Sequence, residues 1–137
     1  MSSKPIIAIT MGDINGISPE IIGKVLTNKE ITKICTPIIL GNIQAYLYYC
    51  RKLNNYLEPV KINIPEEAPK LKSKIGIIEL EYTSLDMKPG ILDPQNSTSA
   101  TAWIRQAVKW CTEKRCDAMV TCPITKEGLA RAGIPYD

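Results

Sequence analysis

The stretch Pro5-Ile-Ile-Ala-Ile-Thr-Met-Gly-Asp-Ile-Asn-Gly-Ile-Ser-Pro-Glu20 decides the fold of this 137-residue chain. Residues 5–10 form an apolar, β-branched run without polar alternation, which is typical of a strand covered on both faces in a parallel sheet. A glycine-containing turn follows at residues 11–16. Ser18, as an N-cap, and Pro19, at the first helical position, then predict a helix start. The stretch therefore predicts a strand, a turn and a helix in succession.

The same alternation continues along the chain. Further strands are predicted at residues 36–40, 58–64, 75–82 and 117–121, with proline punctuation at 65–69 and a loop at 83–96. Helices are expected at residues 18–26, 41–53, 97–115 and 124–132. This order predicts an α/β fold with a mostly parallel sheet flanked by helices and right-handed crossovers. No linker divides residues 1–137 into two domains.

Composition excludes several classes of function. The 45% hydrophobic content and the formal net charge of +3, from 17 basic and 14 acidic residues, are typical of a folded globular protein. The lysines are scattered along the chain, so we expect no nucleic-acid partner. No apolar run approaches the roughly 20 residues of a membrane span, and no export signal opens the chain. We therefore expect a soluble, cytoplasmic protein with no membrane partner.

The content of cysteine and histidine narrows the chemistry further. Five cysteines occur without a C-x-x-C pair, which favours reduced thiols over a disulfide framework or a zinc site. Histidine is absent, so these residues cannot supply a Ser-His-Asp triad or imidazole metal ligands. Chemistry on this chain must use other side chains or the backbone, or must be completed elsewhere.

Two segments lie where an open α/β sheet binds its ligands, at the carboxyl ends of strands. In the turn at 11–16, Gly12 and Gly16 permit close backbone approach, and Asp13 adds a carboxylate. The turn matches neither a Walker motif nor the G-x-G-x-x-G dinucleotide fingerprint, and alone it fits a purely steric role. The second segment, residues 120–126, would bring Thr121 and Lys126 to the same edge of the sheet.

Lys126 is unusual because the helix dipole disfavours a cation in a first helical turn. An anionic ligand such as a phosphate or carboxylate would explain it, and extension into solvent would explain it equally well. Cys122 lacks a histidine to activate it, so a buried thiol is expected there. Trp103 and Trp110 share one helical face, which favours core or interface packing over base stacking.

Both segments resemble signatures of one enzyme family, the 4-hydroxythreonine-4-phosphate dehydrogenases. The first signature is usually Thr-Met/Pro-Gly-Asp/Glu-Pro-Ala-Gly-Ile-Gly-Pro-Glu, and residues 10–20 are similar to it. Residues 120–135, Val-Thr-Cys-Pro-Ile-Thr-Lys-Glu-Gly-Leu-Ala-Arg-Ala-Gly-Ile-Pro, resemble the second, Thr-x-Pro-Ile-x-Lys followed by an Ala-Gly turn. Two signatures in the right order are far more specific than either alone.

The resemblance implies that residues 1–137 are the amino-terminal part of a longer two-domain enzyme related to the isocitrate and isopropylmalate dehydrogenases. It implies a homodimer that uses NAD and a divalent metal to oxidise and decarboxylate a phosphorylated hydroxy acid, 4-phosphohydroxy-L-threonine, in vitamin B6 synthesis. The family's metal-binding histidines and its Gly-His-Thr-Glu segment would lie beyond Asp137. The expected substrate-binding residues here are Asp13, Asn15, Gly16, Thr121 and Lys126, with no catalytic residue or metal ligand assigned.

The first loop departs from the family pattern at three positions. Ile14 replaces the usual proline, Asn15 the usual alanine and Ser18 the usual second glycine. These departures leave open a related dehydrogenase of another four-carbon acid-sugar phosphate. Two further alternatives remain: a non-catalytic truncated product that serves as a binding or assembly module, and a small stand-alone phosphate-binding protein.

Overall fold

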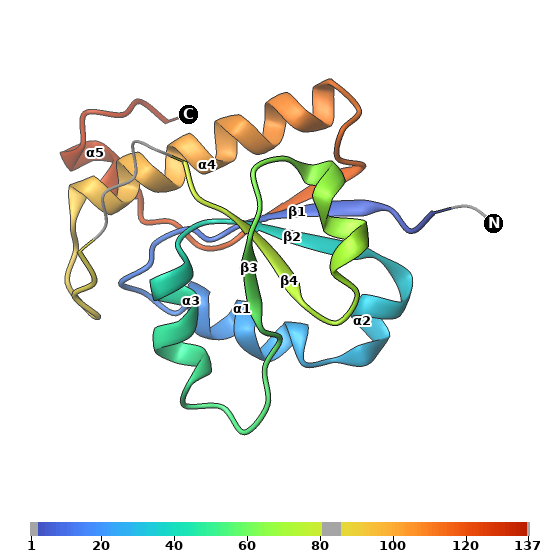
Figure 1. Cartoon of the computed structure of the whole chain (residues 1–137). Helices are drawn as coiled ribbons and strands as arrows, with labels where there is room; N and C mark the ends of the chain where they lie inside the picture. Colours follow the sequence, from blue (N-terminus) through green and yellow to red (C-terminus); the bar gives the residue numbers. More distant parts are fainter. Residues whose placement is uncertain (1–2, 81–85, 137) are drawn as a thin grey trace.

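The computed structural model, which describes residues 3–80 and 86–136, contains a parallel sheet with strand order β3-β4-β2-β1-β5 (Figure 1). All four strand pairs in this sheet are parallel, so the predicted α/β class is confirmed. The strands are β1 (Ile6–Thr10), β2 (Thr36–Leu40), β3 (Pro59–Lys61), β4 (Ile75–Ile78) and β5 (Ala118–Thr121). The helices are α1 (Ser18–Leu26), α2 (Lys29–Ile34), α3 (Ile43–Cys50), α4 (Pro94–Thr112), α5 (Lys126–Arg131) and the 3-10 helix η1 (Pro65–Leu71).

The direction of each crossover decides which face of the sheet a helix covers. The chain moves outward from β1 to β2 and then to β3, and it returns through β4 to β5 on the far side of β1. Because parallel crossovers are right-handed, helices on the outward and return paths must lie on opposite faces. Figure 1 shows α1, α2 and α3 below the sheet and α4 above it.

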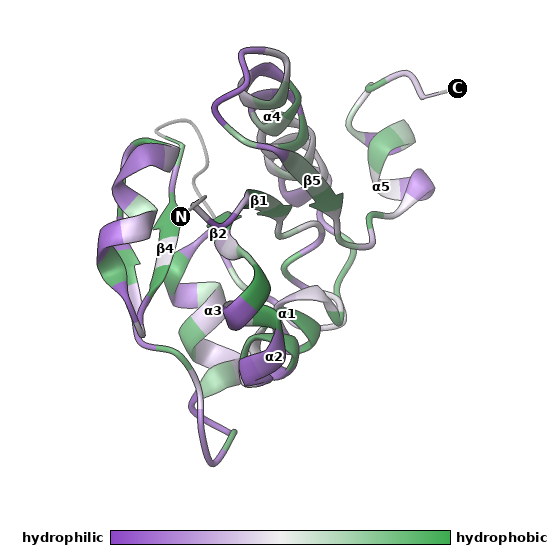
Figure 2. Ribbon diagram, turned by 90° about the vertical axis from the view of Figure 1, so that its right-hand side faces the viewer, coloured by the Kyte–Doolittle hydropathy of each residue, from purple (hydrophilic) through white to green (hydrophobic). Residues whose placement is uncertain are grey.

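The core lies between the inner strands and these two helical layers. All four residues of β4 and the last four of β2 are buried, as the uninterrupted apolar runs predict (green in Figure 2). Trp103 is 0% exposed and Trp110 is 5% exposed, so of the two expected kinds of packing, core or interface, both residues show core packing. Strand β5, at the edge of the sheet, is mostly exposed, and Val120 is 52% exposed.

Several predicted boundaries were wrong. The strand expected at 58–64 has only three paired residues, and the 65–69 punctuation belongs to η1. Helix α2, which was not predicted, is a short segment without a buried residue, so it lacks the apolar stripe that periodicity detects. Helix α4 begins at Pro94, because Asp93 caps it by accepting a bond from the Gln95 amide at 2.9 Å. The strand expected at 75–82 ends at Ile78, and residues 81–85, which belong to that expected strand and to the expected loop, lie outside the described residues.

The predicted capping role of Ser18 was also wrong. Ile17 occupies the N-cap position of α1, and Ser18 is the first helical residue. The Ser18 hydroxyl instead donates a hydrogen bond to the carbonyl of Pro123 at 3.2 Å. The Ser18 side chain, which was expected to cap α1, therefore connects the start of α1 with the segment around Pro123.

All five cysteines are free thiols. Within residues 3–80 and 86–136, no helix combines the length and the hydropathy that crossing a bilayer requires.

A candidate site at the carboxyl edge of strands β1 and β5

The candidate site lies where β1 and β5 end side by side. The two strands pair in parallel, with Thr10 opposite Thr121, so the turns that follow them emerge at one edge of the sheet, called here the carboxyl edge. The turn after β1 leads to α1 below the sheet, whereas β5 leads to α5, which packs against α4 above it (Figure 1). Such a divergence is the topological switch point at which open α/β sheets bind ligands.

The two turns are in direct contact. The Asp13 amide donates to the Pro123 carbonyl at 3.1 Å, and the Cys122 amide donates to the Thr10 carbonyl at 3.1 Å. Gly12 has a φ of +70°, and a Cβ atom at this position would lie 2.5 Å from the Pro123 oxygen. Only glycine satisfies both demands, because L side chains disfavour this φ and the opposing atom belongs to the backbone. The expected meeting of the two segments on one rim is therefore observed.

Asp13 and Gly16 shape the first turn. The Asp13 carboxylate accepts a bond from the Asn15 amide at 3.0 Å, and the Gly16 amide donates to the Asp13 carbonyl at 3.1 Å. Asp13 remains partly exposed, so the turn presents a carboxylate at the carboxyl edge. A substrate contact by Asp13 or Gly16 stays a prediction.

Asn15 holds a neighbouring loop in place. Its side chain donates to the Ile91 carbonyl at 2.9 Å and accepts from the Lys88 amide at 2.8 Å, while its own carbonyl accepts from the Gly90 amide at 2.8 Å. Asn15 is only 3% exposed. These contacts give Asn15 a positioning role for residues 88–91, and its predicted substrate contact is not required to explain them.

Thr121 and Lys126 are both exposed at the carboxyl edge. Lys126 is the first residue of α5, which Thr125 caps by accepting a bond from the Gly128 amide at 3.1 Å. The Lys126 ammonium lies 5.9 Å from the centre of the Tyr136 ring, within the range of a cation–π contact. Tyr136 was not singled out from the sequence, since no periodic pattern connects a chain end with a helix start.

Sequence reasoning also missed a set of buried polar groups. In the part of the chain that the structure describes, the Thr10 hydroxyl, both amide atoms of Asn96 and the Trp103 indole N–H have no hydrogen-bond partner. Thr10 ends β1 and Asn96 lies in the first turn of α4. Asn96 precedes Ala100, Trp103 and Ala107 at helical spacing, so extending the apolar face by one turn would have revealed it.

Two other chemistries are disfavoured at this edge. Burial raises the pKa of the Cys122 thiol and keeps it protonated, so Cys122 is no activated nucleophile. Within residues 3–80 and 86–136, no three cysteine, aspartate or glutamate side chains gather closely enough to hold a metal ion, and the sequence contains no histidine. The residues described therefore do not fit a divalent-metal site.

Comparisons with known proteins find relatives of this chain. A family model described as "Pyridoxal phosphate biosynthetic protein PdxA" matches residues 33–137. A 4-hydroxythreonine-4-phosphate dehydrogenase of Prosthecochloris aestuarii is 36% identical over 136 residues, covering 94% of this chain and 39% of that protein. A D-threonate 4-phosphate dehydrogenase of Cupriavidus necator is 32% identical over 129 residues, covering 94% of this chain and 39% of that protein.

A similar fold occurs in a solved structure. The crystal structure of a 4-hydroxythreonine-4-phosphate dehydrogenase from Burkholderia phymatum superposes with a TM-score of 0.90 at 27% identity, covering 98% of this chain and 41% of that chain. The present chain thus spans about two fifths of the length of these relatives.

Proposed function

Because the chain belongs to the PdxA family of pyridoxal phosphate biosynthetic proteins, we propose that it forms one wall of the active site of a dehydrogenase for a four-carbon phosphorylated hydroxy acid. The observation that carries this proposal is the contact between the turns after β1 and β5, through the Asp13 amide and the Pro123 carbonyl. It places a carboxylate and an exposed lysine on the two sides of one switch point.

In this proposal, Lys126 neutralises the negative charge of the substrate, and its ammonium is mobile enough to follow a phosphate or carboxylate. Thr121 offers a hydroxyl to the same ligand, and Asp13 accepts hydrogen bonds from polar groups near the reacting carbons. Asn15 and Gly16 keep the turn after β1 in shape. NAD would accept the hydride, and a divalent metal would supply the Lewis acid for decarboxylation. The residues described do not fit that metal, so in this proposal its ligands belong to another part of the enzyme. We further propose that the enzyme is cytoplasmic and homodimeric.

The leading substrate is 4-phosphohydroxy-L-threonine, and D-threonate 4-phosphate is the alternative. The first carries an ammonium where the second carries a hydroxyl, and a carboxylate such as Asp13 complements the ammonium better. The three departures in the first loop favour neither substrate, since Ile14 and Ser18 are buried and Asn15 is engaged with residues 88–91.

A chimeric enzyme tests the proposal. The 137 residues would replace the matching part of the Prosthecochloris aestuarii relative, and NADH formation would be followed with each substrate. Lys126→Gln should raise KM about tenfold, corresponding to about 1.4 kcal/mol of lost substrate binding. Lys109→Gln, on the exposed side of α4, is the control and should change nothing. Equal effects of the two variants would remove Lys126 from the site.

Asp13→Asn in the same chimera discriminates between the substrates. It should impair turnover of 4-phosphohydroxy-L-threonine more than turnover of D-threonate 4-phosphate, because only the first substrate loses a charge partner. The 137-residue chain alone, given NAD, metal and either substrate, should show no turnover. Robust activity of the isolated chain would refute the assignment of the metal ligands to another part of the enzyme.

The non-catalytic alternative is favoured by one observation, the lack of a metal-ligand cluster within the described residues. A binding or assembly module, or a stand-alone phosphate-binding protein, would bind phosphate esters without metal. A chimera that is folded but inactive with both substrates, together with metal-independent binding at Lys126, would support that alternative.

A further inference from the structure

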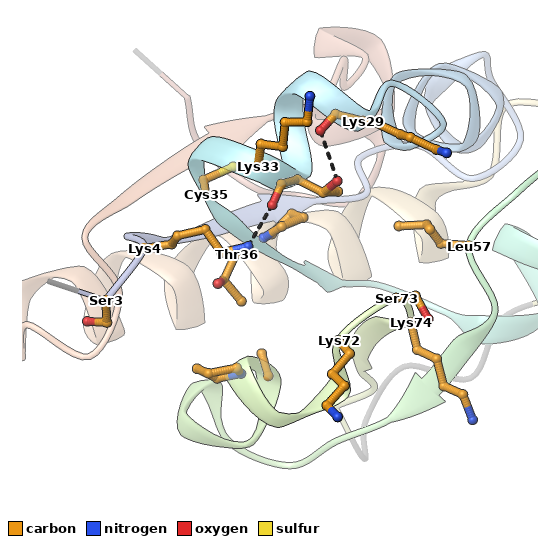
Figure 3. A pocket seen from close by; sticks show the side chains of 14 residues that line it. Ser3, Lys4, Lys29, Lys33, Cys35, Thr36, Leu57, Lys72, Ser73 and Lys74 are labelled. Atoms are coloured by element: carbon orange, nitrogen blue, oxygen red, sulfur yellow. Dashed lines mark hydrogen bonds between the residues drawn. The ribbon is translucent and has the colours of Figure 1, made fainter. Parts of the chain in front are cut away.

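A second candidate site lies at the opposite end of the sheet. A hollow of about 750 Å³ opens between α2 and the turn that joins η1 to β4 (Figure 3). Thr36, the first residue of β2, is part of its lining, so the hollow lies at the amino ends of the strands. A five-residue strand spans roughly 16 Å, which separates this hollow from the carboxyl edge. We call it the lysine pocket.

Positive charge is concentrated in the lysine pocket. Its lining contains no carboxylate and includes five lysines: Lys4, Lys29, Lys33, Lys72 and Lys74. These five charges exceed the formal net charge of the whole chain, +3, so the rest of the chain is net acidic. The lysines come from three separate segments that the fold brings together, and they surround the opening in Figure 3. A potential of this kind attracts anions.

Local partners do not account for all of this charge. Lys33 lies 2.8 Å from Glu30 and Lys74 lies 3.9 Å from Glu58, but both pairs are exposed and therefore weak. Lys29 and Lys72 have no carboxylate partner within the described residues. The helix dipole does not explain Lys29 either, because this residue begins α2, where a cation is disfavoured.

The floor of the lysine pocket is apolar. Pro37, Leu57 and Ala68 line it, and Ala68 is only 5% exposed. The Lys4 ammonium already donates a hydrogen bond to the carbonyl of Thr32, another residue of the pocket lining, at 2.7 Å. The other four lysines start at the edges of the pocket, and their side chains extend outward from it in Figure 3. An apolar floor inside a ring of cations is complementary to a ligand with an apolar body and an anionic group.

We propose that the lysine pocket binds a small phosphate monoester with an apolar body. A phosphate monoester is close to doubly charged at neutral pH and offers three acceptor oxygens, which suits several lysine ammonium groups better than one carboxylate does. The hollow has the volume of a small-molecule site, not of a polymer channel. This binding is independent of the proposed dehydrogenase function, because the pocket shares no residue with the carboxyl edge.

Calorimetry on the 137-residue chain at low ionic strength tests the proposal, with phenyl phosphate as the probe. Phenyl phosphate should bind at least about tenfold more tightly than inorganic phosphate, since only the ester covers the apolar floor. The double variant Lys29→Gln/Lys72→Gln should weaken phenyl phosphate binding about tenfold. The control Arg105→Gln/Lys109→Gln removes the same charge from exposed positions of α4 and should leave the affinity unchanged.

The proposal would be overturned by equal binding of phenyl phosphate and inorganic phosphate, by equal weakening in both double variants, or by tighter binding of a short single-stranded oligonucleotide than of phenyl phosphate. Lys126→Gln separates this site from the proposed active site, because it should leave phenyl phosphate binding intact. Loss of binding in Lys126→Gln alone would place the ligand at the carboxyl edge and overturn the assignment to the lysine pocket. Circular dichroism of each variant checks that it is folded.

Discussion

At the scale of single residues, the carboxyl edge depends on side chains whose roles cannot be read from their neighbours in sequence. Ser18 precedes proline and glutamate, as an N-cap residue should, yet it is helical and bonds to Pro123. Asn15 sits in a glycine-rich turn, yet it bonds to residues more than 70 positions away. These hydrogen bonds satisfy polar groups that the fold has buried, which local propensity does not describe.

Thr10 provides the first prediction at this scale. Its hydroxyl is fully buried and has no partner among the described residues, and such a group costs about 1–3 kcal/mol. Thr10→Val keeps the shape and removes the hydroxyl, so it should raise the free energy of unfolding by about 1 kcal/mol in urea titrations. Thr121→Val, at the paired but exposed position of β5, should have little effect. A marked loss of stability in Thr10→Val would show that the hydroxyl is hydrogen-bonded.

Gly12 provides the second prediction at the scale of single residues. Gly12→Ala should lower the free energy of unfolding by about 3 kcal/mol, because it combines a strained φ with a clash against the Pro123 carbonyl. Gly133 is the matched control, since its φ is +71° but no atom of the described residues lies within 4 Å of the place that a Cβ atom would occupy. Gly133→Ala should cost only about 1 kcal/mol. Equal losses in chemical denaturation would argue that the turns after β1 and β5 do not touch.

At the scale of elements, η1 is joined to the turn between α4 and β5 by a bidentate ion pair. Arg115 donates to both Glu66 carboxylate oxygens, at 2.7 and 2.9 Å. The hydrogen bonds from Arg115 hold the pKa of the Glu66 carboxyl down to about 2, from an ordinary value of 4.5. The proline punctuation at 65–69 predicted only an interruption between strands, because prolines at both ends of so short a segment are typical of a turn.

The lowered pKa gives this ion pair a defined pH dependence. A carboxyl whose pKa is lower in the folded state stabilises that state above its unfolded pKa, and this contribution is lost as the pH falls toward the folded pKa. Native protein should therefore be more stable than Glu66→Gln at pH 7, and the gap should close between about pH 4.5 and 2. The effect is modest because both side chains are partly exposed.

Urea denaturation across this pH range measures the gap between native protein and Glu66→Gln. Glu127→Gln, which removes a more exposed partner of Arg131 within α5, is the control and should show a smaller pH dependence. A constant difference between native protein and Glu66→Gln from pH 7 to pH 2 would contradict the assigned ion pair.

At the scale of the whole molecule, the sheet ends in an exposed strand. Among the described residues, β5 pairs with β1 on one side only, and apolar side chains such as Val120 and Ile17 are more than half exposed. Unpaired edge strands with apolar side chains favour association. The isolated chain should therefore self-associate at high concentration in sedimentation experiments, and Val120→Lys should reduce this association. Val108→Lys, on exposed α4 surface, is the control. A monodisperse monomer at all concentrations would contradict the prediction.

The sequence by itself determined the local elements and the range of possible chemistry. Uninterrupted β-branched runs located β1 and β2 to within one residue, because burial on both faces of a parallel sheet demands such runs. The amphipathic pattern located most of α4, although it missed the first turn because Pro94 is equally typical of a loop. The absence of histidine, a property of composition, limited the chemistry independently of the fold.

Only the tertiary structure decided which distant segments meet. The order β3-β4-β2-β1-β5 places the turn after β1 against the turn after β5, and it gathers lysines from three segments around one hollow. The periodicity of apolar residues predicts whether a residue is buried, but it does not predict which distant residue lies against it. Neighbours follow from strand order and crossover direction, which are set by packing of the whole chain around its core.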